Sequence, residues 1–366
     1  MFKKIKTAIK SFRKSLAKAL FDKRKRSNKT LDMNNVKSVL FLRSDNKIGD
    51  MVVLTLVFRE LKRKYPDIKI SVLCGKDNKE IIKNNPNVDE IIEQQLRITG
   101  NKVPNYELRI NDKDNSITDV VVDFFVFRPR PKHLLMLRRL NPGFLIGFNK
   151  QDYNIYDLSI NCDVNTLHIS KRYEILLEAL AIKPASLKYD IFLDENTERK
   201  AKEIFSKNKN NLVINPFAAS RHRSFSFDKL QTLINSIKEK ADVNIYAICA
   251  KNSAGLLKDL KGAEVLETDS ILESAAFIKY CDYVLTPDTS IVHIAAAFGK
   301  KTVALYLDYC GQEEKINEIW APGYADAVQI SVDTKNGTLE NDIKNIENEI
   351  ILKALEVQQL GGSAVR

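Results

Sequence analysis

Short apolar segments alternate with amphipathic ones along the first half of the chain. The apolar runs predict strands at residues 38–42, 68–73, 90–92, 119–127 and 144–148. Helical periodicity predicts helices at residues 50–64, 78–84 and 169–181. Residues 97–116 are polar and contain Gly100 and Pro104, so we expect a loop or a small excursion there. Alternation of this kind is typical of a parallel sheet covered by helices.

The second half repeats the pattern after Lys183 and Pro184. Strands are predicted at residues 212–214, 243–250, 265–266, 282–285 and 302–306, with a loop at 251–255. Helices are predicted at residues 228–240, 271–280, 291–298 and 341–357. The last of these could cross back to the first half. We therefore expect a first lobe (31–185), a second lobe (186–335), an N-terminal arm (1–30) and a C-terminal helix and tail (336–366).

The stretch TPDTSIVHIAAAFG at residues 286–299 has the order strand, tight turn, helix. Asp288, Thr289 and Ser290 are residue types that cap helices, and Gly299 is typical of a helix end. A helix N-terminus has unpaired N–H groups and about half a positive charge, which suits a diphosphate. An ordinary capped helix is the simpler alternative, and the stretch by itself favours it.

Composition excludes several classes of protein. The 366 residues are 44% hydrophobic, but no apolar run approaches the ~20 residues of a membrane span. The cysteines are odd in number and contain no CxxC pair, which favours a reducing compartment. The histidines form no HxxxH pair, so we expect no zinc site. These residues are Cys74, Cys162, Cys249, Cys281 and Cys310, with His133, His168, His222 and His293.

The net charge of +11 is confined to the N-terminal arm, since residues 1–30 hold twelve Lys or Arg and one acid. The body is neutral, which argues against nucleic acid as a partner. Six apolar residues of the arm recur at helical spacing, as in a helix that lies on an anionic membrane. A solvated tail or a helix docked on the body are the alternatives. The six are Phe2, Ile5, Ile9, Phe12, Leu16 and Leu20.

Three segments, taken together, carry a family resemblance. They are KIGDMVVLTLVFRELKRKYPDIKISVL at 47–73, NPFAASRHRSFSFDKL at 215–230 and PDTSIVHIAAAFGKKTVALY at 287–306. In order and spacing they resemble the family 9 glycosyltransferases, the lipopolysaccharide heptosyltransferases and their relatives. The resemblance implies a GT-B fold, in which two doubly wound Rossmann-like lobes face each other across a cleft. It also implies acceptor binding in the first lobe, a nucleotide sugar in the second, inversion, and no metal or cofactor.

In the first segment, Asp50 matches the family's general base, which takes a proton from the attacking acceptor hydroxyl. A helix N-cap is its simpler interpretation. Gly49 would let the backbone approach the substrate closely. With Lys47, Arg128 and Arg130 it forms the predicted acceptor side, although a solvated basic surface would explain these cations equally well.

In the second segment, Arg223 stands where the family usually has a phosphate-binding Lys, and Ser220 matches a small polar residue beside it. In the third, the diphosphate-binding turn matches Asp288, Thr289, Ser290 and His293. His293 falls one turn into the helix, where it could reach the phosphates or simply pack. Ser290 replaces the usual Gly, and residues 249–255, CAKNSAG, lack the family's nucleoside-binding Glu.

The leading hypothesis is a cytoplasmic transferase held on the inner face of a bacterial inner membrane. It would move heptose or a related sugar, with ADP-heptose as the expected donor, to a lipopolysaccharide core or lipid A-type glycolipid. A second hypothesis keeps the fold but changes the donor or uses a protein or other glycan as acceptor. A third is an inactive sugar-binding protein, against which the joint presence of Asp50, Arg223 and Asp288 argues.

Overall fold

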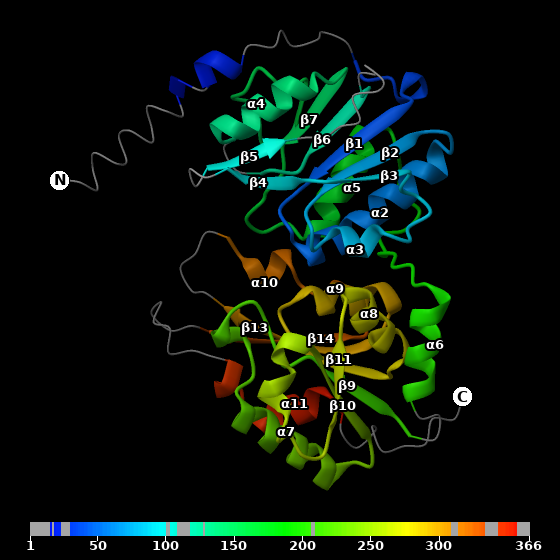
Figure 1. Cartoon of the computed structure of the whole chain (residues 1–366), viewed down its shortest axis with the longest axis vertical. Coiled ribbons are helices and arrows are strands. Elements are labelled where there is room, and N and C mark those ends of the chain that lie inside the picture. The colour runs from blue at the N-terminus through cyan, green and yellow to red at the C-terminus, as the bar shows by residue number, and fades with distance from the viewer. Residues whose placement is uncertain are drawn as a thin grey trace, which may run out of the picture.

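The computed structural model describes residues 15–16, 18–22, 30–99, 103–107, 118–126, 129–205, 209–308, 314–333 and 343–356. These residues form two α/β lobes that follow each other along the longest axis of the molecule (Figure 1). Each lobe is built on one six-stranded sheet. The predicted fold class, two doubly wound α/β units, is confirmed.

The first sheet is parallel throughout and has the strand order β3-β2-β1-β6-β7-β8. Its strands are β1 (Ser38–Arg43), β2 (Lys69–Cys74), β3 (Glu90–Glu93), β6 (Val120–Asp123), β7 (Phe144–Phe148) and β8 (Leu158–Ile160). Its helices are α2 (Ile48–Lys64), α3 (Lys79–Ile82), α4 (Pro131–Leu140) and α5 (Ile169–Ala179). The first three turns of α2 are buried almost all round, which is typical of a helix inside a protein core.

Of the two alternatives predicted for residues 97–116, the described part fits a small excursion from the sheet and not a loop. Strands β4 (Gln95–Thr99) and β5 (Val103–Glu107) pair antiparallel as a separate hairpin. The pairing supplies backbone hydrogen bonds to a segment whose polar sequence gives little sign of a strand. Residues 108–117 lie outside the described part. The strand predicted at 119–127 is also shorter than expected, because β6 ends at Asp123.

The second sheet is parallel and has the order β11-β10-β9-β12-β13-β14. Its strands are β9 (Asn211–Ile214), β10 (Asn244–Ala250), β11 (Glu264–Thr268), β12 (Tyr283–Pro287), β13 (Lys301–Asp308) and β14 (Ala327–Asp333). Its α-helices are α6 (Glu195–Ile204), α7 (Phe227–Lys240), α8 (Ile271–Tyr280), α9 (Ser290–Phe298), α10 (Ile316–Ile319) and α11 (Asn348–Ala354). The described residues also form the 3₁₀ helices η1 (Met33–Asn35), η2 (Arg221–Arg223), η3 (Lys251–Leu257) and η5 (Ile343–Asn345). Helix η3 replaces the loop predicted at 251–255.

Both sheets reverse their order of winding at one place, between β1 and β6 in the first and between β9 and β12 in the second. At such a switch point the connections leave the sheet in opposite directions, which opens a crevice beyond the carboxyl ends of the strands. The fold therefore marks two places where ligands are expected, and the predicted site residues can be compared with them.

The C-terminal helix stays with the second lobe. Its buried side chains Ile351 and Leu352 belong to the apolar core under α7, and Lys240 Nζ lies 2.9 Å from Glu349. The hypothesis that this helix crosses back to the first lobe is therefore wrong. The apolar face of α11 is buried in the same cluster as the apolar side of α7, and this burial removes the reason to cross.

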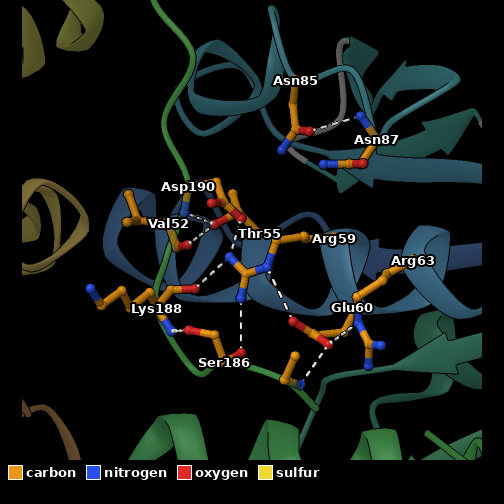
Figure 2. A network of polar contacts seen from close by, with 11 residues as sticks. Val52, Thr55, Arg59, Glu60, Arg63, Asn85, Asn87, Ser186, Lys188 and Asp190 are labelled. Carbon is orange, nitrogen blue, oxygen red and sulfur yellow. Dashed lines mark hydrogen bonds and ion pairs between the residues drawn. The ribbon is translucent and has the colours of Figure 1, made fainter.

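The segment that joins the lobes is bound along the back of α2 (Figure 2). Glu60, with 1% of its surface exposed, accepts the Ala185 N–H at 2.9 Å. Arg59 donates to the carbonyl oxygens of Ser186 and Lys188, both at 2.8 Å. It also pairs with the Asp190 carboxylate. The joining segment thus belongs structurally to the first lobe up to Asp190.

The described end of the N-terminal arm is docked on the first lobe. Asp22 is buried and accepts the Ile155 N–H at 2.7 Å, and Arg138 donates to the Leu20 carbonyl at 2.8 Å. Leu16 and Leu20 nevertheless remain 47% exposed each. The rest of the predicted amphipathic face lies outside the described residues. Among the helices that the structure describes, none is long and apolar enough to cross a bilayer.

Candidate active site

The turn between β12 and α9 has the predicted order of strand, cap and helix. Thr289 is the N-cap, and its hydroxyl accepts the Ile291 N–H at 3.2 Å. Gly299 ends the helix with φ +61°, a left-handed conformation that glycine adopts without strain. The first amides of α9 therefore point beyond the carboxyl end of β12, at the second switch point.

Asn215, the residue after β9, closes the other side of this switch point. Its buried amide nitrogen donates to the Thr286 hydroxyl at 3.0 Å and to the Thr289 hydroxyl at 3.1 Å. These bonds tie the carboxyl ends of the two central strands together and fix the cap of α9. Asn215 begins the segment at 215–230 that carries the family resemblance, but it was not among the predicted site residues. Its position, a polar side chain directly after an apolar strand, could have indicated it.

Arg223 brings a cation to the same turn from η2. Its Nη1 lies 2.8 Å from Asp288 Oδ2, and its Nε donates to the Ser220 hydroxyl at 3.3 Å. Burial raises the pKa of Asp288, and the guanidinium opposes this rise. The carboxylate therefore holds Arg223 beside the N-terminus of α9. Of the predicted donor residues, Ser220, Arg223, Asp288, Thr289 and Ser290 are brought together here.

His293 is placed between the lobes. It is 4% exposed, and its ring centroid lies 6.1 Å from that of Tyr189 and 5.8 Å from that of Trp320. Its Nδ1 is buried without a hydrogen-bond partner among the described residues. Burial lowers the pKa of His293 to about 3, so the ring is neutral near pH 7. In this arrangement the ring packs at the junction of the lobes.

The N-terminus of α2 meets the N-terminus of α9 across this junction. A Cβ added at Gly49 would lie 3.0 Å from His293 Cδ2 and 3.6 Å from Ser290 Cα. Glycine is what permits the two backbones to approach so closely. Asp50 is the third residue of α2 and is buried, while Lys47 is the N-cap. The alternative in which Asp50 caps the helix is therefore wrong.

Arg43, the last residue of β1, is the partner of Asp50. It is buried, forms an ion pair with the Asp50 carboxylate, and places its guanidinium 5.7 Å from the Phe124 ring centroid. The pair fixes the carboxylate at the first switch point, since β1 borders it. Sequence reasoning missed Arg43, although a cation that closes an apolar strand was visible.

The other predicted acceptor residues are not gathered around Asp50 by any described contact. Lys47 and Arg130 are exposed, and Arg130 is the N-cap of α4. Arg128 lies outside the described residues. Gly49 is the one member of that set whose surroundings join the two lobes.

Among the described residues, no group of three or more His, Cys, Asp or Glu side chains is arranged to hold a metal ion. A cavity of about 480 Å³ shares no residue with the site. It is lined by Thr197, Lys200, Glu203, Ile204, Glu267, Asp269, Glu273 and Phe277.

Comparison with known proteins decides the family. Residues 135–336 match the family model described as glycosyltransferase family 9 (heptosyltransferase). "Putative lipopolysaccharide heptosyltransferase 4" of Escherichia coli strain K12 is 30% identical, over 87% of this chain and 90% of that protein. The chain belongs to glycosyltransferase family 9. As a member of this family it is a glycosyltransferase, and the resemblance read from the three segments is confirmed.

Other relatives of this family 9 glycosyltransferase support the same family and fold. "Lipopolysaccharide heptosyltransferase 3" of the same strain is 23% identical over 75% of this chain and 86% of that protein. A family 9 glycosyltransferase from Veillonella parvula has a TM-score of 0.71 at 15% identity, covering 91% of this chain and all of that one. An E. coli heptosyltransferase solved with ADP has a TM-score of 0.62 at 16% identity, covering 88% and 99%. At these identities the solved structures establish the fold.

Proposed function

We propose that this family 9 glycosyltransferase transfers a heptose from ADP-heptose to the core of a lipopolysaccharide-type glycolipid, with inversion and without a metal ion. The names of the two E. coli relatives support the sugar and the acceptor class. A solved E. coli family relative that holds ADP-2-deoxy-2-fluoro heptose supports the donor. The donor of this chain is assigned by analogy with these relatives.

The observation that carries the proposal is the meeting of the two helix N-termini. Gly49 and Ser290 lie in near contact, which supports a reaction centre shared by Asp50 and the turn of Thr289. A general base and a diphosphate site are the two functions that a sugar transfer requires. The first belongs to the acceptor lobe and the second to the donor lobe.

In the proposed reaction, Asp50 accepts the proton of the acceptor hydroxyl as its oxygen bonds to the anomeric carbon. The bond from that carbon to the diphosphate oxygen breaks on the opposite face, and its electron pair leaves with ADP. The amides at the start of α9 and the Arg223 guanidinium stabilise the charge that develops on the diphosphate. Arg43 holds the Asp50 carboxylate in place before the acceptor arrives.

We further propose that the enzyme works on the cytoplasmic face of the inner membrane. The docked residues 18–22 anchor the arm on the first lobe, while Leu16 and Leu20 stay exposed. A basic helix with an exposed apolar face binds anionic lipid. This would bring the first lobe close to a lipid-linked acceptor.

The test is a donor-binding screen of the full-length protein by calorimetry, followed by product analysis with an acceptor glycolipid in excess EDTA. We expect ADP-heptose to bind and to be consumed with EDTA present. Preference for UDP- or GDP-sugars would overturn the donor assignment, and absence of binding to every nucleotide sugar would overturn the transferase site. Loss of turnover in EDTA, restored by a divalent cation, would overturn the metal-independent mechanism.

A further inference from the structure

A second ionised cluster lies on the other side of the first switch point from Arg43. Asp123, the last residue of β6, is 1% exposed. Its carboxylate contacts His133 Nε2 at 2.8 Å and accepts the Tyr156 hydroxyl at 2.6 Å and the Phe125 N–H at 3.0 Å. Burial raises the pKa of Asp123, but these three partners outweigh it and hold the pKa below its ordinary value. The carboxylate is therefore ionised and fully partnered.

Buried residues of β7 and of the segment that follows it pack around this carboxylate. Lys150 and Tyr156 are each 1% exposed, and burial lowers the pKa of Lys150 to about 8, opposed by Asp123. A Cβ at Gly147 would lie 2.5 Å from the Tyr156 ring and 2.9 Å from Lys150 Cγ, so β7 needs glycine there. Burying charges is costly unless they are paired, and replacing a buried ion pair by apolar residues is often neutral or stabilising. A gain in stability is therefore a weak explanation for this cluster.

His133 is the member of the cluster that reaches the surface. Its side chain is 19% exposed, against 1% for Asp123, and its ring packs 5.0 Å from that of Phe125. A carboxylate only accepts hydrogen bonds, so Nε2 carries the hydrogen of this contact. In the described part of the chain no hydrogen bond is made by His133 Nδ1. His133 Nδ1 is therefore the atom of the cluster that we expect to contact a ligand.

The cluster and the proposed base share one edge of the sheet. Phe124 lies under the Arg43 guanidinium that pairs with Asp50, and the next residue, Phe125, lies against His133. Two successive residues after β6 therefore link the proposed base to the histidine. Helix α2 packs with Phe124 on one face of the sheet and α4 with Tyr156 on the other, so a molecule beside Asp50 would reach His133 by crossing this edge.

We propose that His133, held by Asp123, binds an acidic group of the acceptor, a carboxylate or a phosphate. The proposal rests on the proposed function, which places the acceptor in the first lobe. A protonated imidazole donates from both nitrogens, from Nε2 to Asp123 and from Nδ1 to the anion. The Asp123 carboxylate holds the ring and also accepts the Tyr156 hydroxyl, and Lys150 interacts with that carboxylate electrostatically. Arg130 is exposed at the start of the helix that carries His133.

Imidazole NMR of the full-length protein tests this directly, because the chain has only four histidines. The His133 signals are assigned by their loss in His133→Gln, and the wild type is titrated with inorganic phosphate and with glucuronate at pH 6 and pH 8. We expect a saturable shift of His133 that is weaker at pH 8. A response to phosphate alone assigns the group as a phosphate, and a response to glucuronate alone as a carboxylate.

Variants separate this role from a structural one. His133→Gln should weaken binding of the responding anion about tenfold, the loss expected for one charged hydrogen bond. Asp123→Asn should weaken it as well, while Arg139→Gln, an exposed cation on the same helix, should not. In turnover assays His133→Gln should raise the acceptor KM and leave the donor Kd unchanged.

Several results would overturn the proposal. These are a wild-type His133 signal that responds to neither anion, equal affinity at both pH values, or wild-type anion affinity in His133→Gln. Failure of the proposed function is a different result, because it would show as absent donor binding or transfer while the anion titration still succeeded. The titration of the wild type needs no variant to fold.

Discussion

The close approach of α2 and α9 leads to a prediction about Gly49→Ala. The new methyl group would lie 3.0 Å from His293 Cδ2, about 0.5 Å or more inside the usual carbon–carbon contact distance. The His293 ring is packed between Tyr189 and Trp320 and cannot rotate away freely. The two helix N-termini must therefore separate by several tenths of an ångström.

The expected cost lies in turnover and not in folding. A misplacement of ~1 Å between reacting groups can cost 10²-fold in rate, so half of that should lower kcat by about tenfold. Alanine is favoured over glycine by up to ~1 kcal/mol in a helix interior, and at Gly49, in the first turn of α2, this preference offsets part of the strain. We expect a melting temperature equal to or above that of the wild type, with a donor Kd changed less than threefold, or roughly 0.6 kcal/mol.

The assay is steady-state transfer together with thermal unfolding and donor calorimetry. Gly255→Ala is the matched control, because a Cβ there meets nothing within 4 Å. Gly49→Ala should lower kcat less in the His293→Ala background than in the wild type, and a double-mutant cycle measures this difference. If Gly49→Ala keeps the wild-type kcat, the contact of Gly49 with His293 is not the reacting arrangement, and the argument from this junction fails.

Three further predictions concern the remaining parts of the site and the arm. Asp50→Asn should lower kcat by ~10² to 10⁴ with little change in donor Kd, measured by turnover and calorimetry, and an equal loss of donor affinity would remove Asp50 from the role of base. Arg223→Ala should weaken ADP far more than AMP in calorimetry, because the lost cation faces the diphosphate, and equal losses would make Arg223 structural. A chain that begins at Asn34 should keep its fold and act on a soluble acceptor fragment, but it should unfold ~1–3 kcal/mol more easily, because the buried Ile155 N–H loses Asp22. It should also lose binding to anionic vesicles, and the full-length chain should bind them less well as salt is added. Equal co-sedimentation of the two chains would show that the arm is not the membrane contact.

The sequence predicted the central strands of each sheet and one of its two edges, and it missed the other edges, β8 and β14. Strands β1, β9 and β12 are apolar runs buried on both faces, so hydrophobicity alone finds them. Helix α6 was missed because Ala201 is its only fully buried residue. It is held instead by Glu198, which pairs with Lys279 and accepts the Tyr280 hydroxyl at 2.7 Å. Pairing between distant charged residues leaves no periodic pattern in the sequence.

The candidate site divides in the same way. The turn of Thr289 was predictable because cap, helix and terminal glycine are consecutive residues. The partner of Asp50 was not, since Arg43 becomes its neighbour only when β1 and α2 fold together. Asp123 could have been recognised as a candidate from the sequence. An acid inside the apolar run at 119–127 must be partnered if buried, but the sequence does not say by which residues.

The attachment of the joining segment to α2 determines where the two lobes can pivot. Glu60, Arg59 and Thr55 hold the chain as far as Asp190, and α6 begins at Glu195 on the second lobe. The Phe192 carbonyl also accepts a hydrogen bond from Asn84 at 3.4 Å, so we expect a rotation of one lobe against the other to bend the chain at residues 193–194. Helix α2 spans ~25 Å, with Asp50 in its first turn and with Thr55 and Arg59, near its middle, bonded to Asp190. Because α2 carries both the joining segment and Asp50, a rotation at this connection would move the carboxylate relative to the diphosphate turn.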